Sequence, residues 1–122
     1  MAEIMVIEDD ELMRDMMTII LERQEHQVIG AENGRDAEQL LKEHSVDLVI
    51  TDILMPVQEG METIMVLKHY YPDMKIIAMT GGGKTGPDIY LNIAKKLGAE
   101  KTLVKPFKHE DLLEAVNSTL KN

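Results

Sequence analysis

The stretch DLVITDILMP, residues 47–56, decides how this chain is expected to fold. Its first five residues form a short, mostly apolar run, which predicts a strand that is buried on both faces. The run stops at a carboxylate, Asp52, and Pro56 follows a few residues later. In open parallel sheets, ligands bind beyond the carboxyl ends of the strands. Asp52 is therefore the first residue to consider as part of a functional site.

Four other runs of similar length resemble it: IMVI (4–7), QVIGA (27–31), KIIAM (75–79) and KTLV (101–104). Between and after the runs, apolar residues recur at helical spacing. The residues that mark these expected helices are Leu12, Met16 and Ile20; Ala37, Leu40 and Leu41; Met61, Ile64 and Met65; Ile89, Ile93 and Leu97; and Leu112, Val116 and Leu120. Strand and helix thus alternate five times. This pattern predicts an α/β fold with a doubly wound parallel sheet and helices on both faces. For five strands the favoured arrangement is flavodoxin-like (βα)5, with strand order 2-1-3-4-5.

Composition limits the classes of function. At 122 residues we expect a single domain, 1–122. The net charge is −9, from 22 acidic and 13 basic residues, which disfavours direct binding to nucleic acid and favours cations. There is no cysteine, so disulfides, thiolate metal sites and thiol catalysis are excluded. The N-terminus carries no signal-peptide or membrane-span pattern, which predicts a cytoplasmic protein without membrane insertion.

The segment MTGGGKTG, residues 79–86, raises the alternative of a nucleotide-binding P-loop. That motif, G-x-x-x-x-G-K-[ST], requires a glycine five residues before Gly83. Ala78 stands there instead, so the match fails by one residue. A P-loop-like nucleotide binder remains an alternative function.

Acidic residues follow two strands that the predicted order makes neighbours. Glu8 and Asp9 come after the first strand and Asp52 comes after the third. Three carboxylates in one pocket repel one another unless a cation neutralises them. Because the ligands are oxygens alone, without histidine or cysteine, the cation expected is Mg2+.

The fourth and fifth strands add groups that suit phosphate. Thr80 and Gly81 end the fourth strand, and Lys105 ends the fifth. A lysine, a hydroxyl and an accessible backbone N–H could hold phosphoryl oxygens, with Asp52 as the nucleophile that forms an acyl phosphate. A Mg2+-dependent phosphohydrolase with an aspartyl nucleophile is a second alternative. Its usual D-x-D pattern is absent, because Leu54 occupies the second position.

Four segments together make the chain resemble a receiver domain of two-component response regulators, of the stand-alone chemotaxis type. They are VIEDDELMR, TDILMPVQEG, AMTG and LVKPF. The resemblance covers essentially the whole chain. It implies phospho-acceptance on Asp52 from a histidine kinase or histidine phosphotransfer protein, rather than enzymatic turnover.

The resemblance also implies roles for other residues. Asp9 and Asp52 would ligate Mg2+ directly, Glu8 would act mostly through water, and the backbone carbonyl of Leu54 would complete the protein ligands. The Lys105-Pro106 peptide is often cis in this family. The output face would comprise the expected helix at 89–97, the strand at 101–104 and the helix at 112–120.

The chain departs from the family pattern at two places. Thr102 stands where an aromatic residue is usual, and Glu8 replaces the more common aspartate. The resemblance also implies that Leu54 and Gly82 border the path of the hydrolytic water. Because neither side chain can orient that water, slow self-dephosphorylation is expected.

Several polar and apolar residues have simpler interpretations. Asp10 and Glu11 are expected to cap the first helix or interact with its dipole. The ten methionines, among them Met16, Met17 and Met65, are expected to fill the core. The four histidines have no metal-ligand spacing and are assigned to no site.

Overall fold

The computed structural model describes residues 1–53, 60–81 and 87–121. Five strands form one sheet, and their bounds are Glu3–Ile7 (β1), Gln27–Ala31 (β2), Leu48–Asp52 (β3), Lys75–Gly81 (β4) and Lys101–Lys105 (β5). Five helices alternate with them: Glu11–Glu22 (α1), Gly34–Leu41 (α2), Gly60–Tyr70 (α3), Pro87–Leu97 (α4) and His109–Lys121 (α5). All strand pairs are parallel, and the order is β2-β1-β3-β4-β5. The predicted flavodoxin-like topology is confirmed.

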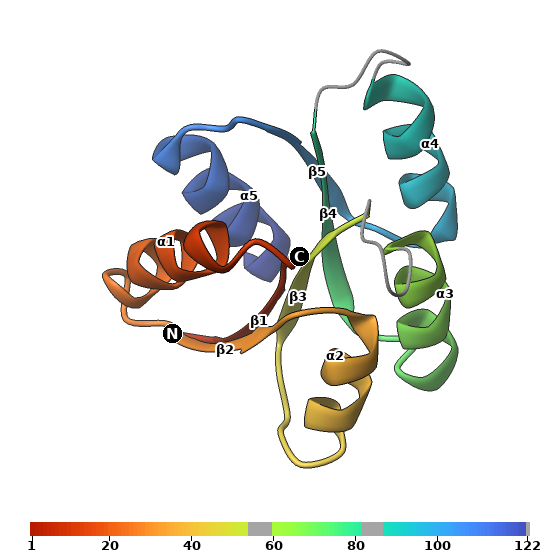
Figure 1. Ribbon diagram of the computed structural model, residues 1–122, viewed down its shortest axis with the longest axis horizontal. Coiled ribbons are helices and arrows are strands. Elements are labelled where there is room, and N and C mark those ends of the chain that lie inside the picture. Colours follow the sequence, from red (N-terminus) through yellow and green to blue (C-terminus); the bar gives the residue numbers. More distant parts are fainter. Residues whose placement is uncertain (54–59, 82–86, 122) are drawn as a thin grey trace.

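The sheet lies between two groups of helices, α1 and α5 on one face and α2, α3 and α4 on the other (Figure 1). Each face carries its own hydrophobic cluster. Alternate residues of each central strand point to opposite faces, as strand geometry requires. In β1, Ile4 and Val6 belong to the cluster that includes residues of α1 and α5, whereas Met5 and Ile7 belong to the cluster that includes residues of α2, α3 and α4. Both faces of the sheet are therefore buried, which explains why the central strands are apolar without interruption.

Two helix boundaries have clear local causes. The side chain of Asp10 accepts hydrogen bonds from the backbone N–H groups of Leu12 and Met13, so the predicted cap of α1 is confirmed. At the C-terminal end of α4, Gly98 has a φ of 122°, a conformation that is unfavourable for residues with a side chain. These caps fix where α1 leaves β1 and where the chain turns from α4 into β5.

The predicted buried stripe of α1 is wrong. Leu12 is 81% exposed and Met16 is 44% exposed, whereas Met17 and Leu21 are fully buried. Of the predicted stripe only Ile20 is buried. Most residues of α1 between 12 and 21 are apolar, so two stripes fit the helical period. The direction in which the helix leaves β1 decides which of them faces the sheet.

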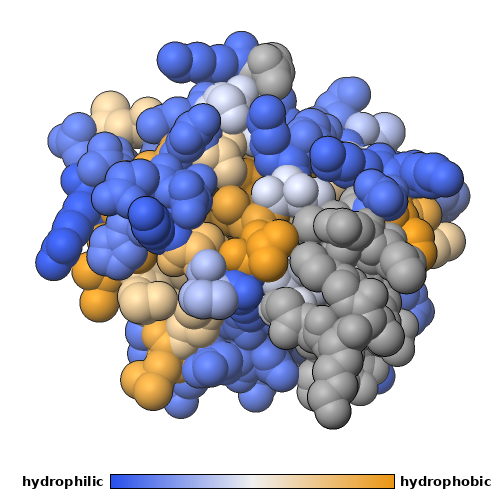
Figure 2. Space-filling view, turned by 90° about the horizontal axis from the view of Figure 1, so that it is seen from above, coloured by the Kyte–Doolittle hydropathy of each residue, from blue (hydrophilic) through white to orange (hydrophobic). Residues whose placement is uncertain are grey.

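The expected stripes of α3 and α4 need the same correction, and those of α2 and α5 do not. Met65 and Ile93 are exposed, while Leu67 and Ala94 lie in the core. Hydrophobic side chains thus reach the surface at several points. Figure 2, in which the molecule is seen from above, shows a hydrophobic patch near the middle of a mainly hydrophilic face.

His26 is the one histidine that is buried among the described residues, and it lies in the turn between α1 and β2. Its Nδ1 accepts a hydrogen bond from the backbone N–H of Ala2 at 3.1 Å, which requires an unprotonated nitrogen. Burial lowers the pKa of His26, and the positive chain terminus lowers it further. The folded protein therefore binds a proton at this side chain less readily than the unfolded chain does.

The free energy of unfolding is expected to fall as the pH is lowered through the unfolded pKa of 6.5, because the unfolded chain then takes up a proton that folded His26 resists. Urea denaturation between pH about 7.5 and about 5.5 measures this. His26→Asn keeps an acceptor without a titrating group and should flatten the dependence. His109→Asn, at an exposed position, should not. Equal slopes in all three proteins would contradict the assignment.

Candidate functional site

The strand ends meet at the carboxyl edge of the sheet. Asp52 is the last residue of β3, and Lys105 is the last residue of β5. The expected strand at 75–79 continues through Thr80 and Gly81, which end β4, because the ladder extends through the pairs Thr80 with Val104 and Gly81 with Lys105. The register thus brings residues from distant parts of the sequence to one edge.

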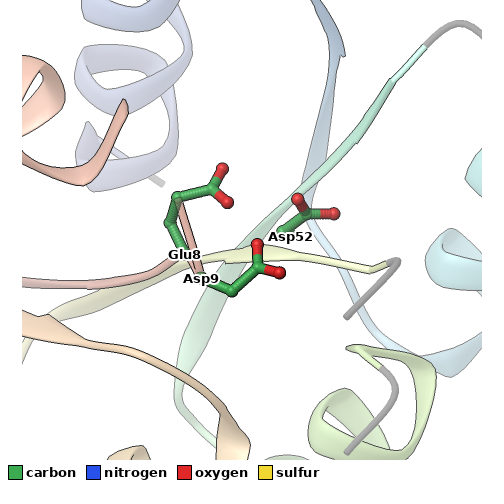
Figure 3. Close-up of side chains that lie close together, drawn as sticks. All are labelled: Glu8, Asp9 and Asp52. Carbon is green, nitrogen blue, oxygen red and sulfur yellow. The ribbon is translucent and has the colours of Figure 1, made fainter. Parts of the chain in front are cut away.

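Three carboxylates gather there from the ends of β1 and β3 (Figure 3). Carboxylate oxygens of Glu8, Asp9 and Asp52 lie within 4.8 Å of one another. Glu8 is 1% exposed and Asp52 is 6% exposed, whereas Asp9 is exposed to solvent. Oxygen atoms at this spacing suit a hard cation, and one exposed member leaves a route for it to enter. The residues present therefore fit Mg2+.

Lys105 lies between two of these carboxylates. Its Nζ donates to Asp52 Oδ2 at 2.7 Å and also to Glu8 Oε1. The second carboxylate oxygen of Glu8 accepts from the backbone N–H of Asp10 at 3.2 Å. One ammonium thus balances part of the negative charge that burial concentrates in the pocket.

The pKa directions follow from these contacts. Burial raises the pKa of Glu8, and the hydrogen bond from Lys105 offsets this only in part. Burial alone would lower the pKa of Lys105, but the hydrogen bonds and charges of Asp52 and Glu8 outweigh it and raise the pKa. The lysine is therefore fully protonated at neutral pH and acts as a fixed positive charge.

Thr80 and Gly81 lie at the same edge on the neighbouring strand. The Thr80 side chain is buried, and its hydroxyl donates to the carbonyl of Gly81 at 3.3 Å. A Cβ added to Gly81 would meet no atom within 4 Å, so the space beside this residue is open within the described part of the chain. Their contact with a phosphoryl group stays a prediction. Leu54, Gly82, Lys84 and Thr85 lie outside the described residues.

Sequence reasoning did not identify every residue that shapes this pocket. Nη1 of Arg14, on α1, donates to the backbone carbonyl of Glu8 at 2.6 Å. The stem of Arg14 crosses β2 at Gly30, which has no side chain to obstruct it. Nothing in the spacing of these residues signals the contact, because it depends on how α1 is rotated against the sheet. The Lys105-Pro106 peptide bond is cis, as the resemblance implied.

Comparison with known proteins agrees with the resemblance. The model of the response regulator receiver domain family matches residues 4–117. The chemotaxis protein CheY of Bacillus subtilis is 36% identical over 118 residues, which cover 96% of each chain. CheY of Halobacterium salinarum is 31% identical and covers 97% of this chain and 96% of its own.

Solved structures are similar over nearly the whole fold. A response regulator receiver domain protein from Clostridium thermocellum has a TM-score of 0.90 and 31% identity, covering 99% of this chain and 95% of its own. CheY4 of Vibrio cholerae has a TM-score of 0.88 and 27% identity, covering 98% of each chain.

Among the described residues, none of the helices has the length and apolarity needed to cross a bilayer.

Proposed function

The chain belongs to the response regulator receiver domain family, and on that premise we propose that it accepts a phosphoryl group onto Asp52 in a Mg2+-dependent reaction. The donor would be a histidine kinase or histidine phosphotransfer protein in the cytoplasm. Phosphorylation would then change the face formed by α4, β5 and α5 and so control the affinity of a downstream protein.

The observation that carries this proposal is the position of Asp52, buried at a strand end beside two more carboxylates and one lysine. An oxygen of Asp52 would attack phosphorus and form a P–O bond. The bond between phosphorus and the donor nitrogen would break, and its electron pair would stay on the imidazole. Burial holds the nucleophile in place and limits water around it.

The neighbouring residues would have distinct tasks. Asp9 and Asp52 would hold Mg2+ directly, Glu8 through water, and Leu54 through its carbonyl. When bound, the metal supplies positive charge for the phosphoryl oxygens. Lys105 already contacts Asp52 and would pair with one of those oxygens as well. The N–H of Gly81 would face another, beside the open space at that residue.

Thr80 is the residue that would link phosphorylation to the output face. Its hydroxyl now donates to the Gly81 carbonyl, and a phosphoryl oxygen would be a stronger, charged acceptor. Movement of Thr80 would displace β5, because Thr80 pairs with Val104 in the ladder. On the same strand, the half-buried Thr102 stands where an aromatic ring is usual. We infer that the switch acts by biasing the start of α4 and not by rotating a ring.

The direct test is incubation with Mg2+ and acetyl phosphate, followed by intact-mass measurement. One phosphoryl group per chain should appear, should depend on Mg2+, and should be removed by hydroxylamine, which cleaves acyl phosphates. Absence of the adduct, or an adduct that resists hydroxylamine, would contradict an aspartyl phosphate.

The same assay separates the alternatives. A phosphohydrolase would consume donor over many turnovers without a stable adduct, and a P-loop-like protein would bind ATP or GTP in calorimetry. No observation in the described structure favours either function.

A further prediction concerns the lifetime of the acyl phosphate. Replacing Leu54 by asparagine and Gly82 by glutamate should speed its decay by roughly tenfold or more, because the new side chains can orient the attacking water. The measurement is the loss of the phosphoryl adduct with time. Leu54→Met, which adds no hydrogen-bonding group, is the control. Equal or slower decay in the double variant would show that these positions do not set the lifetime.

A further inference from the structure

The turn that carries Glu8 and Asp9 is held from α1 by Arg14. Nη1 of Arg14 donates to the backbone carbonyl oxygen of Glu8 at 2.6 Å, across six residues of sequence. The arginine is half-buried, and its own backbone belongs to the first full turn of α1, with its N–H bonded to the carbonyl of Asp10. A rigid helix thus anchors one specific backbone group of the pocket.

That backbone group determines how Asp9 is presented. The carbonyl of Glu8 belongs to the planar peptide unit that joins Glu8 to Asp9. A hydrogen bond to its oxygen therefore restrains the orientation of the whole unit, including the backbone N–H of Asp9. The Glu8 carboxylate is held separately, by Lys105 and by the N–H of Asp10. The backbone N–H of Glu8 is also fixed, by the carbonyl of Ala31 at 3.0 Å. Arg14 therefore completes the restraint of this turn.

Gly30 makes the arginine's position possible. A Cβ on Gly30 would lie 3.1 Å from Cδ and 3.4 Å from Nε of Arg14, closer than such atoms comfortably approach. Gly30 pairs with Val6 within the β1–β2 ladder, where its conformation does not itself call for glycine. The absence of a side chain there leaves a path for the arginine stem over β2 to Glu8.

We propose that Arg14 is a positioning residue for the metal site: through the Glu8 carbonyl it orients Asp9 for Mg2+, and Gly30 provides the space that this requires. The inference rests on the proposed function, since it assumes that Glu8, Asp9 and Asp52 bind Mg2+. Groups that orient metal ligands from outside the ligand set commonly change metal affinity by tenfold or more.

Removing the Arg14 side chain removes both a charge and a hydrogen bond, and the two losses are expected to change Mg2+ affinity in opposite directions. A positive charge near the pocket repels Mg2+, so losing the charge alone would strengthen metal binding. Losing the hydrogen bond would let the peptide plane between Glu8 and Asp9 rotate, and this would weaken Mg2+ binding. Arg14→Ala is expected to weaken Mg2+ binding about tenfold, as measured by calorimetric titration of the unphosphorylated protein. Unchanged or tighter binding would overturn the proposal.

Two further variants test the route through Gly30. Gly30→Ala should displace the arginine stem and weaken Mg2+ binding in the same direction but by a smaller factor. In the Arg14→Ala background the same change should have no further effect, because the obstructed side chain is gone. Additive losses would show that Gly30 acts independently of Arg14.

Controls separate this inference from folding and from the proposed function. Arg23→Ala removes the same charge at the far, exposed end of α1 and should leave Mg2+ affinity unchanged. Alanine is the best helix former, and melting temperatures in EDTA show whether Arg14→Ala folds. If wild-type protein bound no Mg2+, the proposed function would fail. If it bound Mg2+ and Arg14→Ala bound it equally well, only the inference about Arg14 would fail.

Discussion

Asparagine in place of Asp52 is expected to abolish phosphorylation by acetyl phosphate. The amide is a far poorer nucleophile than a carboxylate, and it is also a weaker ligand for Mg2+. The change is nearly isosteric, and Lys105 can still donate to the amide oxygen, so the fold should persist. Intact-mass measurement after incubation should show the adduct in the wild type and only background in Asp52→Asn.

The control for this experiment is Asp73→Asn, which changes an exposed aspartate in the turn before β4. It should be labelled as the wild type is. Glu8 and Asp9 also lie in the pocket, so undiminished labelling of Asp52→Asn would move the acceptor to one of them. Peptide mapping of the residual adduct would then identify which carboxylate reacts.

Replacing Lys105 by methionine is expected to destabilise the metal-free protein by about 2 kcal/mol. Removing one partner of a buried ion pair leaves uncompensated charge and typically costs about 3–5 kcal/mol, and the side chain of Lys105 is partly solvated, at 21% exposure, which reduces the cost. Glu8 and Asp52 would then repel each other without their shared cation. Urea denaturation in EDTA measures the loss.

Mg2+ should restore more stability to Lys105→Met than to the wild type. A divalent cation can replace the missing positive charge, and a ligand that binds only the folded state stabilises it more when it binds more tightly. Phosphorylation should nevertheless be slower, because the ammonium no longer faces the transferring group. Lys108→Met, at an exposed position three residues away, should change neither quantity. A Lys105→Met protein as stable as the wild type in EDTA would contradict the ion-pair assignment.

The period of the apolar residues was sufficient to predict the order of strands and helices along the chain. That alternation in turn predicted a parallel sheet. Runs such as 47–51 and 75–79 are short and rich in β-branched residues, which favours buried strands over helices. Parallel strands bring their carboxyl ends to one edge whatever the details of packing. Asp52 and Lys105, 53 residues apart in the chain, could therefore be placed in one pocket without coordinates.

The sequence could not predict which face of α1 packs against the sheet. Leu12 and Met16 fit the helical period as well as Met17 and Leu21 do, yet only the second pair is buried. Hydropathy measures how apolar a residue is and carries no information about the direction in which a helix leaves its strand. That direction is set by the cap at Asp10 and by the fit of α1 against the sheet.

The sequence by itself thus determined the topology, the carboxylate cluster and the lysine beside it, because regular strand geometry converts spacing into position. Only the tertiary structure decided that Arg14 reaches the Glu8 carbonyl over Gly30. This contact joins α1, β2 and the end of β1, and it exists for one rotation of α1 alone. Side-chain contacts between elements depend on angles that local periodicity does not encode, whereas the order of the strands depends on periodicity and chain direction.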